Sequence, residues 1–271
     1  MDLLKSIFLG ILQGLSEFLP ISSSGHLVIA EYILDFNIGG LAFEVFVHFG
    51  TLLAVLLVFR KDIINLLKAI PDIFRLPSKT LPQERKEYAL LAIYIGIASI
   101  PAALIGILIE QTIEHIFENH ILALAMLFVT GLIVWSSRYS NEKGRRLGGF
   151  SALLIGIAQA FAILPGISRS GSTIVTGLWL GLPRQQAARF SFLLSAPIIF
   201  GASVLKLKDV VQQPLPPVEL LYILCATLAA GISGYIAIIW LLDVIKKQRL
   251  EWFGVYCIAV SLVGLILHFT M

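Results

Sequence analysis

Long apolar segments follow one another along this chain, and they restrict the possible folds more than any other feature of the sequence. A helix that crosses a lipid bilayer needs roughly 20 apolar residues. Six segments reach or approach that length: 42–59, 88–109, 121–137, 190–205, 218–242 and 252–269. No polar domain separates them. We therefore predict an all-α polytopic membrane protein with six full spans, forming a single membrane domain over residues 1–271.

The composition excludes a water-soluble globular protein. Hydrophobic residues make up 58% of the chain and charged residues only 14%, whereas a soluble domain carries about 25% charged residues. The net charge of +3 is small, and the placement of the basic residues is more informative than the total. We expect membrane lipids as partners and no nucleic acid.

Two further apolar stretches, 3–34 and 148–182, are interrupted in the middle by Pro, Gly and Ser. Each is long enough for two half-helices that enter the membrane and turn back. Unwound backbone at that depth is tolerated only where protein or a wet cavity surrounds it. Each stretch is therefore predicted to be a re-entrant broken-helix pair and a candidate wall of a site.

The two broken stretches resemble each other at an offset of 146 residues. Matching pairs are Gly10 and Gly156, Ile11 and Ile157, Gln13 and Gln159, Ile21 and Ile167, Ser22 and Ser168, Ser24 and Ser170, and Gly25 and Gly171. Each copy is followed by three spans, an odd number, which predicts an inverted-topology repeat with repeat 1 at about 1–140 and repeat 2 at about 147–271. Many secondary transporters share this architecture, so a transport function stays open.

Lys and Arg residues lie mainly on one side of the predicted topology. Sixteen of the 20 fall in the loops 60–87, 138–149 and 243–251 or flank the second broken stretch. Because basic residues mark the cytoplasmic side, this distribution supports re-entry and places both termini and the mouth of the first broken stretch outside. The loop 60–87 is predicted either as a solvated loop or as an amphipathic segment on the anionic inner leaflet.

The first broken stretch contains a carboxylate in an apolar surrounding. It reads QGLSEFLPISSSGH over residues 13–26, with Gln13 and Glu17 four residues apart on one helix face. A carboxylate at such a depth costs about 2.5–3.5 kcal/mol on insertion scales, so it indicates function unless a partner neutralises it. Pro20 ends the helix, and a small-residue turn of three serines and Gly25 precedes His26.

The second broken stretch reads PGISRSGST over residues 165–173 and carries Arg169 among hydroxyl side chains. A Gly/Ser turn that opens a helix presents backbone N–H groups and a positive dipole end, which together bind anions. The guanidinium of Arg169 adds a fork suited to phosphate oxygens. An alternative is that Glu17 neutralises Arg169 across the repeat and so holds the two halves together, and the two roles are compatible.

Together these residues suit phosphoryl transfer in a membrane cavity. An arginine stabilises the phosphate oxygens while a hydroxyl or a water attacks in line. A divalent cation also fits, since Mg²⁺ takes one or two carboxylates plus substrate phosphates. Glu17 is the one carboxylate that the motif supplies, with Gln13 beside it, so a bound Mg²⁺ or Ca²⁺ would depend largely on the diphosphate itself.

At these motifs the chain resembles the undecaprenyl-diphosphate phosphatase family of the bacitracin-resistance type. That family carries an (E/Q)xxxE motif, matched by Gln13 and Glu17, and a P-x-S-S-[ST]-G-H motif, matched from Pro20 to His26. Its P-G-x-S-R-S-x-x-T motif is matched from Pro165 to Thr173. The resemblance covers nearly the whole chain in length and segment order.

The resemblance implies removal of the terminal phosphate of undecaprenyl diphosphate, a polyprenyl diphosphate lipid, to give the carrier lipid for bacterial cell-wall synthesis. It implies a site on the outer side of the cytoplasmic membrane. The catalytic residues implied are Glu17 as metal ligand or base, Ser23 as nucleophile, His26 as general acid/base and Arg169 as phosphate clamp. The further phosphate-binding residues expected are Ser22, Ser24, Gly25, Ser168, Ser170 and Thr173.

Three alternatives remain open from the sequence. The attacking group is either Ser23 or a water activated by Glu17 and His26. The competing function is a polyprenyl-phosphate lipid transporter or flippase, which needs charge complementarity but not a nucleophile together with a general acid. The third alternative concerns the oligomeric state, for which both a monomer and a homodimer remain open.

Overall fold

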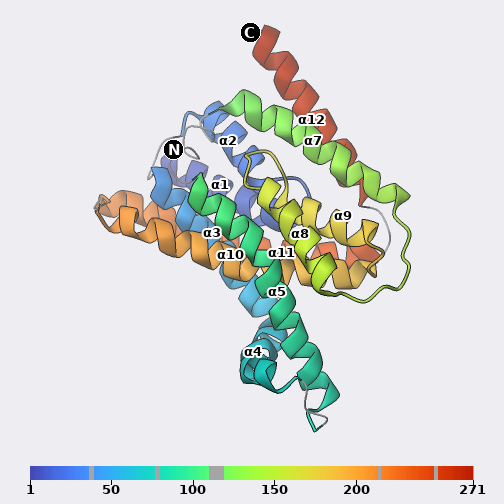
Figure 1. Ribbon diagram of the computed structural model, residues 1–271. Coiled ribbons are helices and arrows are strands. Elements are labelled where there is room, and N and C mark those ends of the chain that lie inside the picture. The colour runs from blue at the N-terminus through green and yellow to red at the C-terminus, as the bar shows by residue number, and fades with distance from the viewer. Residues whose placement is uncertain (37–39, 77–79, 110–118, 213–214, 247–249, 271) are drawn as a thin grey trace.

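The computed structural model describes residues 1–36, 40–76, 80–109, 119–212, 215–246 and 250–270, and these residues contain helices and no strands. The helices are α1 (Asp2–Phe18), α2 (Ser23–Leu34), α3 (Gly40–Val58), α4 (Arg60–Ala69), α5 (Gln83–Leu108), α7 (His120–Trp135), α8 (Gly149–Phe161), α9 (Arg169–Trp179), α10 (Arg184–Gln212), α11 (Pro217–Lys246) and α12 (Glu251–Thr270). Two short 3-10 helices, η1 (Ile70–Arg75) and η2 (Ser136–Tyr139), follow α4 and α7. The all-α prediction is confirmed for the part of the chain described (Figure 1).

Within the described residues, five helices are long and apolar enough to cross a membrane on their own: α5, α7 with η2, α10, α11 and α12. The sixth predicted span, α3, meets the same test together with α4 and η1, although an 82° bend separates them. The structure therefore has five or six candidate spans, as expected of a polytopic membrane protein. Several helices are longer than the apolar segments predicted as spans. The helices α5 and α10 start directly after Pro82 and Pro183, so each includes a polar first turn.

Both interrupted stretches are broken where the sequence predicts. Leu19, the residue before Pro20, has an extended backbone (φ −66°, ψ 143°), because the proline ring disfavours helical geometry at the preceding residue. In the second stretch Gly166 has φ +92°, and a Cβ there would meet the Ala123 carbonyl oxygen at 2.1 Å. Only glycine fits that turn.

Each first half-helix packs closely on a long helix of the other half of the chain. On α1, Gly10 lies so near α11 that a Cβ would meet the Ala226 carbonyl oxygen at 2.2 Å. On α8, Gly156 lies against α5, where a Cβ would meet the Ala98 carbonyl oxygen at 2.5 Å. Small residues that let backbones approach are typical of helix contacts in membranes. Figure 1 also shows α12 beside α7, a contact made through Gly131 and Gly254.

We expect Gly10→Ala to destabilise the protein, because the new methyl group would meet backbone atoms of α11 that cannot rotate away. Overpacking of this kind costs about 1–3 kcal/mol. Thermal unfolding in detergent, followed by size-exclusion chromatography, measures the effect. Gly96→Ala is the matched control, since nothing lies within 4 Å of a Cβ on Gly96. Equal melting temperatures for the two variants would contradict this account of the α1–α11 contact.

Candidate active site

The two breaks meet each other inside the helix bundle. The Ser24 hydroxyl accepts a hydrogen bond from the Gly166 N–H (3.3 Å). In the opposite direction, the Ser170 hydroxyl donates to the Leu19 carbonyl (3.0 Å). Gly25 faces the Gly166 backbone, and a Cβ added to Gly25 would lie 3.0 Å from the Gly166 Cα. Segments about 146 residues apart in sequence therefore form one polar region, as predicted.

The second helices of the two pairs begin with the same cap. Ser22 Oγ accepts from the Gly25 N–H (3.2 Å), and Ser168 Oγ accepts from the Gly171 N–H (3.0 Å). Ser22 adopts φ +70° to do so. Two of the four predicted phosphate-binding serines, Ser22 and Ser168, are thus N-caps. The helices α2 and α9 each bring the positive end of a helix dipole to the region.

Glu17 lies at the centre of the site and is only 8% exposed. Its Oε1 pairs with Arg169 Nη2 at 2.5 Å. Its Oε2 accepts from Ser23 Oγ (2.6 Å) and from Gln13 Nε2 (3.0 Å). The His48 ring lies 3.7 Å from the same oxygen. The structure therefore brings Gln13, Glu17, Ser23 and Arg169 together and shows the ion pair between Glu17 and Arg169.

Two buried polar atoms at this centre have no hydrogen-bond partner among the described residues: Arg169 Nη1 and Gln13 Oε1. A buried donor or acceptor without a partner costs about 1–3 kcal/mol. Arg169 bonds Glu17 through one nitrogen and keeps the other free. The site thus has one free cationic donor and one free oxygen acceptor, which suits an anionic ligand at Arg169.

His26 bonds to groups outside the Glu17 cluster. Its Nδ1 lies 2.8 Å from the Ser22 carbonyl oxygen, which can only accept, so Nδ1 carries a proton. In the neutral ring Nε2 therefore accepts from the Tyr256 hydroxyl at 2.9 Å. The two rings also stack, with centroids 5.6 Å apart. Among the described contacts, none joins His26 directly to Glu17, Ser23 or Arg169.

Hydroxyl side chains fix the second turn from several helices. Thr130 of α7 donates to the Gly166 carbonyl (2.7 Å) and accepts from the Ser168 N–H (2.9 Å). Thr173 bonds the Arg169 carbonyl (2.8 Å) and the Ser191 hydroxyl (2.6 Å). Thr173 therefore supports the backbone that carries Arg169, in addition to any contact with phosphate.

Four residues of the site were missed or ranked low by sequence reasoning. Thr130, Tyr256 and Ser191 lie in segments that read only as apolar spans. His48 is a polar residue in the apolar segment 42–59, but nothing in the sequence indicates Glu17 as its neighbour. Such contacts depend on which faces of α7, α10 and α12 turn inward.

The residues present can hold a cation only if oxygen atoms of the substrate complete its coordination shell. Among the residues that the structure describes, no group of three His, Cys, Asp or Glu side chains lies close enough to hold a metal by itself. Glu17 offers one carboxylate, and the unpartnered Gln13 Oε1 offers one further oxygen. Mg²⁺ bound by one carboxylate normally completes its shell with waters and substrate phosphates.

We expect Glu17→Gln to destabilise the protein, because it leaves the Arg169 guanidinium buried without its counter-ion. Breaking a buried pair in this way costs about 3–5 kcal/mol. Adding Arg169→Met should recover much of that loss, since no charge then remains. Thermal unfolding of the wild type, both single variants and the double variant measures the coupling. Additive losses in the double variant would show that the pair contributes nothing to stability.

The chain is similar to known proteins along nearly its whole length. Residues 6–263 match the family model described as bacitracin resistance protein BacA. The chain is 42% identical to an undecaprenyl-diphosphatase of Halothermothrix orenii, over 98% of both chains, and 44% identical to one of Methanobrevibacter smithii, over 99% of both. It is 39% identical to undecaprenyl-diphosphatase 3 of Bacillus anthracis, over 97% of both chains. This chain belongs to the bacitracin resistance protein BacA family.

Proposed function

We propose that this protein is an undecaprenyl-diphosphate phosphatase, a membrane hydrolase that removes the terminal phosphate of the lipid and leaves undecaprenyl phosphate for cell-wall synthesis. The family and the names of its relatives support this activity. The observation that carries the proposal is Arg169, which lies at a helix N-terminus with one guanidinium nitrogen free beside a hydroxyl bonded to Glu17. Lipid transport, the alternative from the sequence, has no such support among the relatives.

Phosphate binding is proposed at the meeting point of α2 and α9. Both helices present N-terminal N–H groups and a positive dipole end, which favour an anion. Arg169 Nη1, which has no hydrogen-bond partner among the described residues, would donate to a phosphate oxygen. Ser24 and Ser170 line the same junction through their bonds to the opposite turn. In the transition state the guanidinium stabilises the charge that spreads over the phosphate oxygens.

The attacking group is proposed to be Ser23 Oγ, because it already donates to Glu17 Oε2 at 2.6 Å, the arrangement of a nucleophile and its base. Ser23 Oγ attacks the terminal phosphorus, its proton passes to Glu17, and the bond to the bridging oxygen breaks. Undecaprenyl phosphate leaves with that oxygen. A water then attacks the phosphoserine, Glu17 returns its proton to Ser23 Oγ, and the water's proton stays with the released phosphate.

His26 is proposed to act through Nε2, since Nδ1 is held by the Ser22 carbonyl. Tyr256 keeps this ring nitrogen oriented in the protein without substrate. When the ring is protonated, Nε2 also carries a proton, and its delivery would assist departure of a phosphate oxygen, the general-acid role expected of a histidine here. Tyr256 is in this scheme a positioning residue.

A divalent cation, Mg²⁺ or Ca²⁺, is proposed to accompany the diphosphate. Glu17 and Gln13 Oε1 would hold it together with substrate oxygens. When bound, the cation neutralises charge on the two phosphates. The residues themselves still bind the terminal phosphate through Arg169 and position Ser23. A homodimer adds nothing to this scheme, because every residue named comes from one chain.

An inverted repeat of about 1–140 and 147–271 is also proposed. It is supported by the identical serine caps of α2 and α9. It is supported further by the exchanged packing, in which α1 contacts α11 and α8 contacts α5 through glycines at equivalent positions. Both observations are those expected of two copies related by a pseudo-two-fold axis.

The orientation is proposed from the basic residues. If six helices cross the membrane and both termini lie outside, the loops rich in Lys and Arg lie in the cytoplasm. The site then opens to the outer face of a bacterial cytoplasmic membrane. Labelling of an engineered cysteine next to Met1 by a membrane-impermeant reagent, added outside intact cells, tests this orientation.

We expect purified protein in detergent to release phosphate from undecaprenyl diphosphate, and Arg169→Ala to lower the rate by about 10³-fold or more. Glu17→Gln should lower it by about 10²–10⁴-fold, since the base is lost. Chelator, followed by added Mg²⁺ or Ca²⁺, shows whether a cation is needed. Arg145→Ala is the control arginine, exposed in a loop. No release by folded wild-type protein would reject the phosphatase proposal.

We expect Ser23 to become phosphorylated during turnover. Acid quenching with substrate labelled in the terminal phosphate should leave label on Ser23, located by mass spectrometry, and Ser23→Ala should lose both the label and the activity. Ser99→Ala, a change to a hydroxyl that bonds within α5, should keep both. An active Ser23→Ala with no labelled residue would instead assign the attack to a water.

A further inference from the structure

The segment that follows α3 leaves it at almost a right angle. α3 ends at Val58, α4 begins at Arg60, and the axis turns by 82° between them. A helix that departs at this angle from a span close to the membrane normal runs along the membrane surface. Figure 1 shows α4 and the first turns of α5 projecting together beyond the other helices.

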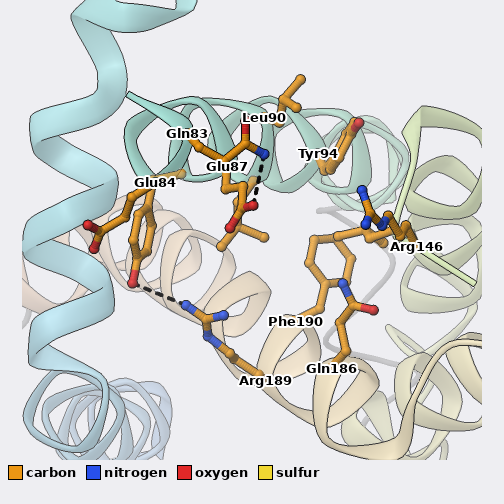
Figure 2. Close-up of a pocket in the computed structure, with 12 residues that line it drawn as sticks. Gln83, Glu84, Glu87, Leu90, Tyr94, Arg146, Gln186, Arg189 and Phe190 are labelled. Carbon is orange, nitrogen blue, oxygen red and sulfur yellow. Dashed lines mark hydrogen bonds between the residues drawn. The ribbon is translucent and has the colours of Figure 1, made fainter. Parts of the chain in front are cut away.

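Polar contacts fix which face of α4 and η1 turns toward the protein. Asp62 pairs with Arg189 of α10 and accepts from the Tyr88 hydroxyl of α5 at 3.0 Å. Arg189 donates in turn to that hydroxyl, at 3.3 Å, and Figure 2 draws this hydrogen bond as a dashed line from Arg189. On η1, Asp72 is 1% exposed and pairs with Arg85 at 2.7 Å. Both acidic residues of 60–75 thus face inward and are neutralised.

The outward face carries large apolar side chains. Ile64, Leu67 and Phe74 are 49%, 61% and 88% exposed, and Ile70 is 48% exposed. Ile64, Leu67, Pro71 and Phe74 follow one another at intervals of three or four residues. Side chains at such intervals lie on one side of a helical segment and form a stripe. A stripe with a phenylalanine this exposed indicates a surface that is covered in the working protein.

Basic residues border the apolar stripe. Arg60, Lys61, Lys68 and Arg75 are all exposed. With Asp62 and Asp72 turned inward, the outward charge of 60–75 is entirely positive. Lys and Arg side chains near an anionic membrane surface are attracted to its headgroups. An apolar stripe bordered by Lys and Arg is the pattern of a helix that lies in the interface of a bilayer.

We propose that α4 and η1 form an interfacial anchor that inserts Ile64, Leu67 and Phe74 among the acyl chains of the surrounding membrane and binds anionic phospholipid headgroups through Lys61, Lys68 and Arg75. The anchor continues directly from α3, the helix that carries His48 to Glu17. Its bonds to Tyr88 and Arg189 connect it also to α5 and α10. The anchor therefore fixes how these helices sit in the bilayer, and the proposal does not depend on the reaction catalysed.

Spin labels on the full chain in lipid nanodiscs test this anchor. In a background with Cys225→Ser and Cys257→Ala, single cysteines replace Leu67 or Phe74, and Asn141→Cys serves as the control in an exposed loop rich in basic residues. Collision rates with oxygen, which partitions into lipid, and with a water-soluble nickel complex are compared. In discs containing phosphatidylglycerol we expect oxygen to be favoured several-fold at 67 and 74 relative to 141.

The anionic part of the proposal is tested by the same labels. Purely phosphatidylcholine discs, or Lys61→Gln with Lys68→Gln and Arg75→Gln, should reduce the preference for oxygen at both positions. Nickel access at 67 and 74 equal to that at 141 would overturn the anchor. Protection from both reagents would also overturn it, since a second copy of the chain or another protein would then cover the stripe. Insensitivity to lipid charge and to the triple substitution would overturn headgroup binding.

Discussion

The ion pair between Glu17 and Arg169 joins the two broken stretches in a region where either charge alone would be costly. An unpaired carboxylate or guanidinium in an apolar membrane segment costs about 2.5–3.5 kcal/mol on insertion scales. The pair at 2.5 Å removes that cost only when both breaks occupy their native positions. Because Arg169 bonds Glu17 through Nη2 and keeps Nη1 without a partner among the described residues, the interaction that assembles the site also leaves a donor in place for the proposed phosphate.

The backbone of the two breaks has to be satisfied in the same region. Unwound segments at membrane depth are tolerated only where protein or water supplies hydrogen bonds. Here each turn uses the other: Ser24 accepts from Gly166 and Ser170 donates to Leu19, while Thr130 completes the second turn. The helices α2 and α9 begin at these turns, and a helix N-terminus favours an anion. The breaks in the two stretches therefore also create the N-termini at which phosphate binding is proposed.

The sequence predicted most helices and the core of the site for identifiable reasons. Proline and glycine mark Pro20 and Gly166 as breaks because their backbone constraints are local. Glu17 and Arg169 stand out because charge is rare in apolar segments. Thr130 and Tyr256 could not be found in this way, since hydroxyl residues in a membrane span are common and only helix packing determines which ones turn toward Ser168 and His26.

The sequence by itself determined the membrane setting, the positions of the two breaks and the residues proposed to bind phosphate. These follow from hydrophobicity, backbone restriction and charge, which are properties of single residues and their near neighbours. Only the tertiary structure decided that Ser23 bonds Glu17, that His26 turns toward Tyr256 and that α4 leaves α3 at 82° with its acidic residues inward. Those outcomes depend on contacts between helices distant in the chain, whose relative rotation no local pattern specifies.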